Sequence, residues 1–182
     1  VIEVKDLCKE FKVYHHRKGF VGAFVNLFSR QHRIVRAVDG ISFTMRRGEI
    51  VGYIGPNGAG KSTTIKMLTG ILVPTSGHLT VNGYVPHRER KENAKRIGVV
   101  FGQRTHLWFD LPVQESFDLL RHIYQIPMKR YEENLELFDH ILELRQFFQT
   151  PVRQLSLGQR MRADLAAALL HNPDVLFLDE PT

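Results

Sequence analysis

Cysteine, long apolar runs and internal repeats are almost or wholly missing from this sequence. Cys8 is its only cysteine, which excludes an internal disulfide and a thiolate metal cluster and favours a reducing compartment. No apolar run reaches the roughly 18 residues that a membrane-spanning helix needs, so the sequence predicts no transmembrane segment. The first six residues include two acids and lead into no basic and then apolar stretch, so we expect no signal peptide.

The composition is that of a globular protein. Hydrophobic residues make up 43% and charged residues 24%, which excludes a disordered tail, a collagen-like fibre and a coiled-coil rod. The length of 182 residues predicts one domain, with room for a small subdomain. Lysine and arginine outnumber the acids by 25 to 19, and the formal charge of +6 favours anionic partners such as nucleotides, nucleic acid or lipid headgroups.

Strand and helix patterns alternate along the chain, which predicts an α/β fold. Hydrophobic alternation and short apolar runs predict strands over 2–4, 34–38, 41–45, 49–54, 78–81, 97–101 and 175–178. Asp39-Gly40 predicts a turn between the second and third of these strands, and so an antiparallel edge. Helices are predicted over 61–69, 88–96, parts of 113–148 and 156–171. Residues 113–171 form a helical subdomain, with an apolar face of Phe117, Leu120, Ile123 and Tyr124, then Leu135, Phe138 and Leu142.

A glycine-rich loop lies between the predicted strand 49–54 and the predicted helix 61–69. Glycine permits left-handed backbone angles that turn N–H groups toward phosphates, and the helix start adds its positive dipole end. Lysine supplies a point charge, and the serine hydroxyl is placed to ligate Mg²⁺. The order of strand, loop and helix disfavours a mere glycine-rich turn. We expect ATP to bind Gly55, Pro56, Asn57, Gly58, Ala59, Gly60, Lys61, Ser62 and Thr63, with Lys61 also catalytic and Ser62 on the metal.

The predicted strand 175–178 ends in two acids, Asp179 and Glu180. Ligands bind at the carboxyl ends of strands in parallel sheets. Asp179 is therefore a candidate for holding Mg²⁺ through a water, and Glu180 for polarising the attacking water. A solvated strand end is the commoner meaning of such a pair by itself. Together with the phosphate loop, the pair favours the catalytic interpretation.

Leu155-Ser156-Leu157-Gly158-Gln159 resembles the Leu-Ser-Gly-Gly-Gln signature of the ATP-binding cassette (ABC) ATPases, and the acid-bearing strand matches that family too. The resemblance covers essentially the whole chain. It implies one ABC ATPase domain over 1–182: a P-loop NTPase sheet with an antiparallel edge subdomain and an inserted helical subdomain.

The resemblance also implies that two cassettes, alike or unlike, dimerise head to tail. Ser156, Gly158 and Gln159 of one cassette would then bind the ATP held by the phosphate loop of the other. Leu157 departs from the family's glycine, so a side chain has to fit near the bound phosphate. The alternative is that Ser156 is only a helix N-cap, which stabilises by about 1 kcal/mol. Both roles are compatible, because an N-cap already directs donors at an anion.

Gln103 falls where the family has a glutamine that contacts Mg²⁺ and the attacking water, so the resemblance makes it a catalytic and metal-binding candidate. Residues 104–116 would then face the membrane partner. Trp108, Phe109 and Leu111 form an apolar cluster there, which is typical either of a contact surface or of a cap on the helical core.

Near the amino end, Phe11 sits where family members stack an aromatic ring on adenine, with Tyr14 as the second choice. Between Tyr14 and Arg33 the chain holds a basic, aromatic stretch beyond what a minimal cassette needs. Such a stretch can lie at a membrane surface or pack on the cassette or its permease. His15-His16 has no carboxylate or thiolate at ligand spacing nearby, which disfavours a metal site.

The sequence therefore predicts the ATP-binding and ATP-hydrolysing subunit of a membrane transporter, using ATP and Mg²⁺. The family implies a peripheral position on the cytoplasmic face of the inner (plasma) membrane and a separate transmembrane permease as partner. Leu107-Trp108 and the sequence of 155–159 resemble the subgroup that pairs with bacterial export permeases.

Other function classes fit the sequence less well. We expect no nucleic acid partner, because DNA-associated cassettes insert a long coiled coil and translation-type cassettes carry two copies. A nucleoside kinase has no need of the signature. A non-transport ABC ATPase, associated with DNA or the ribosome, and a nucleotide sensor that does not hydrolyse ATP remain as alternatives. Intact Lys61, Ser62, Asp179 and Glu180 argue against the sensor.

Family members continue past Pro181-Thr182 into a loop that crosses the dimer interface and to a histidine on the γ-phosphate. No histidine of this chain follows Glu180. We expect the chain to be a fragment that binds nucleotide weakly and hydrolyses ATP poorly by itself.

Overall fold

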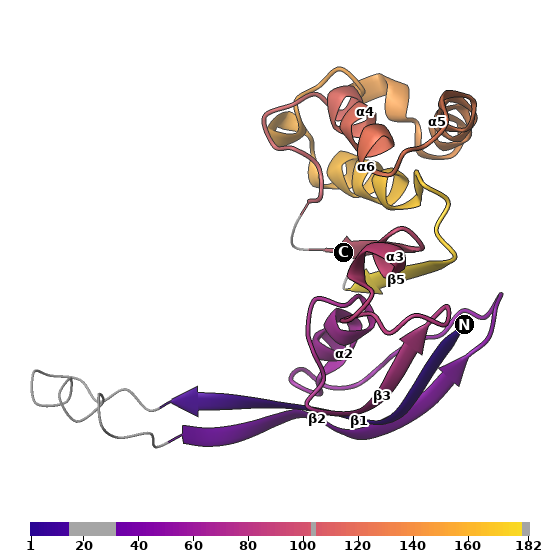
Figure 1. Ribbon diagram of the computed structural model, residues 1–182. Helices are drawn as coiled ribbons and strands as arrows, with labels where there is room; N and C mark the ends of the chain where they lie inside the picture. The colour runs from indigo at the N-terminus through magenta and orange to yellow at the C-terminus, as the bar shows by residue number, and fades with distance from the viewer. Residues whose placement is uncertain (15–31, 103–104, 180–182) are drawn as a thin grey trace, which may run out of the picture. The chain divides into compact units, whose positions relative to one another are not determined.

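A computed structural model describes residues 1–14, 32–102 and 105–179, and the chain divides into two compact units, Val1–Arg90 and Lys91–Thr182 (Figure 1). The amino-terminal unit contains an antiparallel sheet and the helix α2, whereas the carboxyl-terminal unit contains a parallel strand pair and a cluster of helices. The α/β fold predicted from the sequence is confirmed. No helix of the described residues is long and apolar enough to span a membrane.

The sheet of the amino-terminal unit has the order β2-β1-β3, with β1 over Ile2–Tyr14, β2 over His32–Met45 and β3 over Ser76–Val81. Ile2 and Val4 alternate onto the buried face, as a half-buried strand requires. A register shift follows at Asp6, whose φ is +47°. An extra residue of this kind moves the next side chain to the other face, and it explains why Leu7 is also fully buried.

The antiparallel edge is confirmed, but the predicted turn at Asp39-Gly40 is wrong. Residues 32–45 form one continuous strand, and its antiparallel partner is β1. Lys9 pairs with Val38 and Leu7 with Ile41, so β2 carries one residue more than β1 between these pairs. Gly40, with φ +64°, accommodates this bulge without the cost that a side chain would meet there.

The predicted strand 49–54 is also wrong, because residues 49–56 have no regular secondary structure. Ile50 and Ile54 are almost fully exposed, at 102% and 94%. A strand needs a neighbour to satisfy its backbone, and none of the described strands pairs with this segment. The helix that follows is confirmed: α2 spans Lys61–Leu68.

In the carboxyl-terminal unit, β4 (Ile97–Phe101) and β5 (Val175–Asp179) pair in parallel. The chain between them crosses over through helices, as a parallel pair requires. The helix α6 (Leu157–Leu169) packs closely on β4, since a Cβ added at Gly98 would lie 2.5 Å from the Ala168 carbonyl oxygen. Both strands were predicted, although β5 is less buried than its sequence suggests, with Leu178 exposed.

Five helical elements in the described part of this unit bury a common hydrophobic core: α4 (Val113–Ile123), α5 (Met128–Leu142), η1 (Leu144–Phe147), η2 (Val152–Gln154) and α6. The short helix α3 (Arg90–Ala94) begins at the unit boundary, and its buried residue is the polar Asn93. Phe117 lies at the centre of the core and meets Phe148 edge to face, with ring centroids 5.6 Å apart. Leu120, Tyr124, Leu135, Phe138 and Leu142 are part of this core or pack against it, as predicted. Ile123 differs, because it ends α4 and is exposed.

Replacing Phe117 by alanine tests the position of this core. Phe117 is fully buried, so Phe117→Ala should lower the free energy of unfolding by about 3–5 kcal/mol through lost burial and a cavity. Leu119→Ala is the matched control, because Leu119 lies on the same helix but is exposed, and it should cost about 1 kcal/mol or less. Denaturant unfolding measures both, and equal losses would contradict this placement of the core.

Candidate functional site

The glycine-rich loop supplies the backbone geometry that its sequence predicts. Gly58 and Gly60 both have φ +83°, and α2 begins directly after Gly60 at Lys61. Left-handed residues at a helix start turn successive N–H groups toward one concave surface, and the helix dipole adds positive potential there. A Cβ added at Gly58 would meet no atom within 4 Å, so the space beside this backbone is open. The loop therefore fits an anionic group such as a phosphate.

Three hydrogen bonds and one close backbone approach hold this loop against α2 and the sheet. The Lys61 ammonium donates to the carbonyl oxygens of Gly55 and Pro56, at 2.8 and 3.0 Å, which keeps its charge over the loop. The Thr64 hydroxyl donates to the Gly60 carbonyl at 3.0 Å. Gly60 lies so close to β2 that an added Cβ would be 2.2 Å from the Ala37 carbonyl oxygen. Glycine is thus required at position 60 both by this close packing and by the positive φ.

The other loop residues predicted to bind nucleotide are accessible. Residues 55–59, with Pro56, Asn57 and Ala59, are exposed, and Ser62 and Thr63 are partly exposed in the first turn of α2. The Ala59 N–H donates to the Pro56 carbonyl at 3.1 Å, which closes a tight turn. The Ser62 hydroxyl is an oxygen donor of the kind that Mg²⁺ prefers.

Phe11 lies on β1 opposite Val35, and its ring is exposed. The Lys9 ammonium is 5.1 Å from the ring centroid. An exposed aromatic ring beside a cation can stack on a base, so Phe11 stays a candidate for adenine contact. The side chain of Tyr14 and residues 15–31 lie outside the described part of the chain.

The acid-bearing strand ends beside the strand that leads to Gln103. Asp179 is the last residue of β5 and pairs with Phe101, the last residue of β4. The Gly102 N–H donates to the Asp179 carbonyl at 2.9 Å, which fixes this edge. Gln103 and Glu180 themselves lie outside the described residues, and the chain leads to both from this same edge. The predicted metal ligand Asp179 is partly exposed here.

The signature segment begins α6 with a complete capping box. The Gln159 N–H donates to Ser156 Oγ at 3.2 Å, and the Ser156 N–H donates to Gln159 Oε1 at 2.9 Å. This pattern satisfies two backbone donors of the first turn, so the N-cap role of Ser156 is confirmed. Gly158 has open space where a Cβ would point, and Leu157 is 62% exposed. The unusual leucine therefore projects into solvent at the helix start.

Sequence reasoning missed Asp164, a buried carboxylate on α6. Asp164 is only 6% exposed, and its Oδ1 accepts hydrogen bonds from the Thr105 hydroxyl and the His106 N–H. Burial raises the pKa of the Asp164 carboxyl, and these hydrogen bonds partly oppose the rise. An acid within the run Met161–Leu170, which is otherwise mostly apolar, is the signal that could have found it.

The apolar cluster after Gln103 divides between surface and core. Trp108 and Phe109 are exposed, at 40% and 52%, whereas Leu107 is buried and Leu111 is partly buried. The guanidinium of Arg160 on α6 lies 5.7 Å from the Phe109 ring centroid. Leu107 thus belongs to the helical core, whereas a contact role for the exposed Trp108 and Phe109 stays a prediction.

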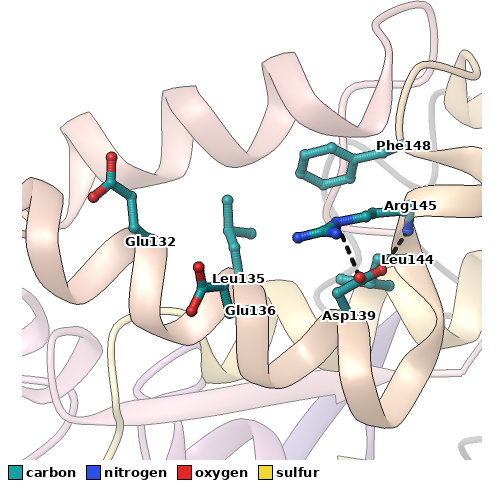
Figure 2. A pocket seen from close by; sticks show the side chains of 7 residues that line it. All are labelled: Glu132, Leu135, Glu136, Asp139, Leu144, Arg145 and Phe148. Carbon is teal, nitrogen blue, oxygen red and sulfur yellow. Dashed lines mark hydrogen bonds and ion pairs between the residues drawn. The ribbon is translucent and has the colours of Figure 1, made fainter.

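A hollow of about 220 Å³ opens between α5 and the η1 region (Figure 2). Its floor is apolar, and its rim carries acids, one of which pairs with arginine; the lining residues are Glu132, Leu135, Glu136, Asp139, Leu144, Arg145 and Phe148. Carboxylates repel phosphate, so this hollow is unsuited to a nucleotide. The phosphate loop remains the candidate site.

Comparisons with known proteins find similarity to ATP-binding proteins of ABC transporters. The profile of a family described as ABC transporter matches residues 38–182. The probable multidrug ABC transporter ATP-binding protein YbhF of Escherichia coli is 35% identical over 182 residues, 100% of this chain and 28% of that protein. The Nod factor export ATP-binding protein I of Ralstonia nicotianae is 38% identical over 145 residues, 80% of this chain and 45% of that protein. The chain thus spans less than half of either relative.

Among solved structures, the dimeric post-hydrolysis state of the ATP-binding cassette MJ0796 bound to ADP and Pi resembles this chain with a TM-score of 0.76. The two are 25% identical, and the likeness covers 100% of this chain and 75% of that one.

Substituting Gly58 and Gly60 by alanine, one at a time, separates the energetic cost of a left-handed backbone from the cost of a steric clash. Gly58→Ala places a side chain at φ +83° in open space, so it should cost about 1–2 kcal/mol of unfolding free energy. Gly60→Ala adds a clash with the Ala37 carbonyl at the same φ, so it should cost clearly more. Thermal and denaturant unfolding without nucleotide measure the difference, and equal losses would show that α2 does not pack on β2 in this way.

Proposed function

The chain belongs to the ABC transporter family, and from this premise we propose that it binds and hydrolyses ATP to power a membrane transporter. One observation carries the proposal. The chain has two exposed helix starts whose N–H groups can bind an anion: the glycine loop before α2 and the capped Ser156 before α6. A head-to-tail pair of cassettes would bring the first start of one copy to the second start of the other. The dimeric cassette of similar fold supports such pairing.

Each residue has a distinct part in this proposal. The N–H groups of residues 58–62 bind the β- and γ-phosphates, and Lys61 neutralises their charge. Ser156 and the N–H of Gly158 contact the γ-phosphate from the second copy, and Phe11 stacks on adenine. Gln159 serves mainly to cap α6, because its side-chain oxygen is taken by the Ser156 N–H. Glu180 polarises the attacking water as a general base, and Gln103 orients that water.

A magnesium ion fits the oxygen groups that the chain offers. The Ser62 hydroxyl, the Asp179 carboxylate and the Gln103 carbonyl are hard donors of the type that Mg²⁺ binds, together with waters. Bound Mg²⁺ would neutralise charge that develops on the transferred phosphoryl group. The chain's own residues position the ATP and remove a proton from the water.

The transporter is proposed to be an exporter with a separate permease. The similar proteins whose names describe multidrug transport and Nod factor export support this direction. The exposed rings of Trp108 and Phe109, on the segment after Gln103, are proposed to contact the permease at the cytoplasmic face of the membrane. An exposed apolar pair on a well-anchored segment is typical of a contact surface.

A nucleotide sensor is the second candidate, and exposed Leu157 is the observation that favours it. A leucine at the first turn of α6 occupies space that a second copy's phosphate would approach. If this side chain prevents close approach, the chain would bind ATP without forming the closed dimer.

Glutamine in place of Glu180 tests the proposal in the full-length protein. Removal of the general base should lower Mg·ATP turnover by about a hundredfold or more and should trap a nucleotide-bound dimer. Light scattering with Mg·ATP measures the dimer, and phosphate release measures turnover. Glu92→Gln is the matched control, because Glu92 lies on α3 and pairs only with nearby Lys95 in the described structure, and it should leave both measurements unchanged.

Binding of ATP without turnover or dimerisation in the unsubstituted protein would favour the sensor. Turnover that survives Glu180→Gln would show that another group acts as the base.

A further inference from the structure

Asp164 is a buried charge that the proposed catalytic chemistry does not use. It lies two turns along α6 from Ser156 and is surrounded on its helix by the buried small residues Ala163, Ala166 and Ala167. A buried carboxylate is unfavourable unless hydrogen bonds replace its hydration. An apolar residue would fill such a place at lower cost, so the acid calls for an explanation.

The two hydrogen bonds that Asp164 Oδ1 accepts in the described structure both come from the segment that follows Gln103. Its Oδ1 accepts from the Thr105 hydroxyl at 2.8 Å and from the His106 N–H at 3.0 Å. The Thr105 oxygen in turn accepts from the Leu107 N–H at 3.1 Å. One carboxylate oxygen thus organises three consecutive residues, which lie 57 to 59 positions earlier in the sequence.

The rest of this segment is attached to the same helical cluster by further contacts, including a hydrogen bond from the Trp108 N–H to the buried Ser116 hydroxyl at 3.3 Å. The Phe109 and Leu111 carbonyls accept from the backbone N–H groups of Arg153 and Val152, at 2.9 and 3.0 Å. Arg153 also forms an exposed ion pair with Asp110, and exposed pairs contribute little. The hydrogen bonds to Asp164 are therefore the buried contacts of this segment that lie nearest to Gln103 in the sequence.

We propose that Asp164 is a positioning residue that joins the segment Thr105–Leu111 to the signature helix, so that partner contacts at Trp108 and Phe109 are transmitted to Ser156. The transmission rests on the proposed function, whereas the attachment does not. Trp108 and Phe109 stand on the outer side of the segment, and α6 begins at the signature. If the permease displaces these rings, the start of α6 should move with them. The buried hydrogen bonds of Asp164 prevent the segment from sliding over the helix.

Substitutions at Asp164 separate its hydrogen bonds from its charge. Both donors use Oδ1, so Asp164→Asn keeps an acceptor for each of them, while Asp164→Leu keeps the size and removes the acceptor. Asn134→Ala is the matched control. Asn134 is likewise buried and polar, and its side-chain N–H groups donate to the Leu170 carbonyl and Asn172 Oδ1, so neither of these hydrogen bonds involves the Thr105–Leu111 segment.

Two measurements on the full-length protein test the proposal. Amide hydrogen exchange of the peptide that contains His106 reports the attachment, and ATP turnover with and without the permease in lipid vesicles reports the transmission. Asp164→Leu should speed exchange by about tenfold and reduce the stimulation of turnover by the permease about fivefold or more. Asp164→Asn should retain most of both. Asn134→Ala should lower the melting temperature without changing either.

Slow exchange that persists in Asp164→Leu would overturn the attachment. An equal loss of stimulation in Asn134→Ala, or a loss in Asp164→Asn as large as in Asp164→Leu, would overturn the transmission through these hydrogen bonds. If the unsubstituted protein shows no ATP turnover, the proposed function fails and the exchange data alone decide whether Asp164 holds the segment.

Discussion

The first turn of an α-helix leaves backbone N–H groups without partners inside the helix, and both functional regions of this chain are built on that constraint. Before α2, the left-handed glycines Gly58 and Gly60 leave these donors facing an open, concave loop. Before α6, Ser156 and Gln159 satisfy two of them reciprocally. The start of α2 is therefore open to an anion. The start of α6 is fixed by its cap, so that its remaining N–H groups have a defined direction.

Close backbone approach packs both helices against strands. Gly60 brings the start of α2 against the Ala37 carbonyl of β2, and Gly98 brings β4 against the Ala168 carbonyl near the end of α6. Glycine at these two positions lets a helix lie closer to a strand than any side chain would allow. The consequence is that the functional loops are carried by well-packed elements, although the loops themselves are exposed.

The carboxyl-terminal unit gathers several predicted functions around one helix and one sheet edge. α6 carries the signature at its start and Asp164 further along, and its packing on β4 connects it to the edge where Phe101 and Asp179 end their strands. The chain leads from that edge to Gln103 and Glu180. This arrangement gives a physical basis for communication between the signature and the segment proposed to face a partner, because the connecting contacts are buried and short.

Local patterns in the sequence were sufficient for the phosphate loop, the capped helix start, the strands β4 and β5 as separate elements and most of the helical core. The loop geometry depends on glycine angles, and the cap depends on residues three positions apart, so neighbouring residues determine both. Tertiary structure decided the rest. Asp39-Gly40 is a bulge because of how β1 pairs with β2, and 49–54 has no strand partner among the described residues despite its apolar run. Asp164 acquired its role from Thr105 and His106, which are distant in sequence. Pairing and burial of this kind depend on which segments meet in space, and a local sequence pattern does not specify this.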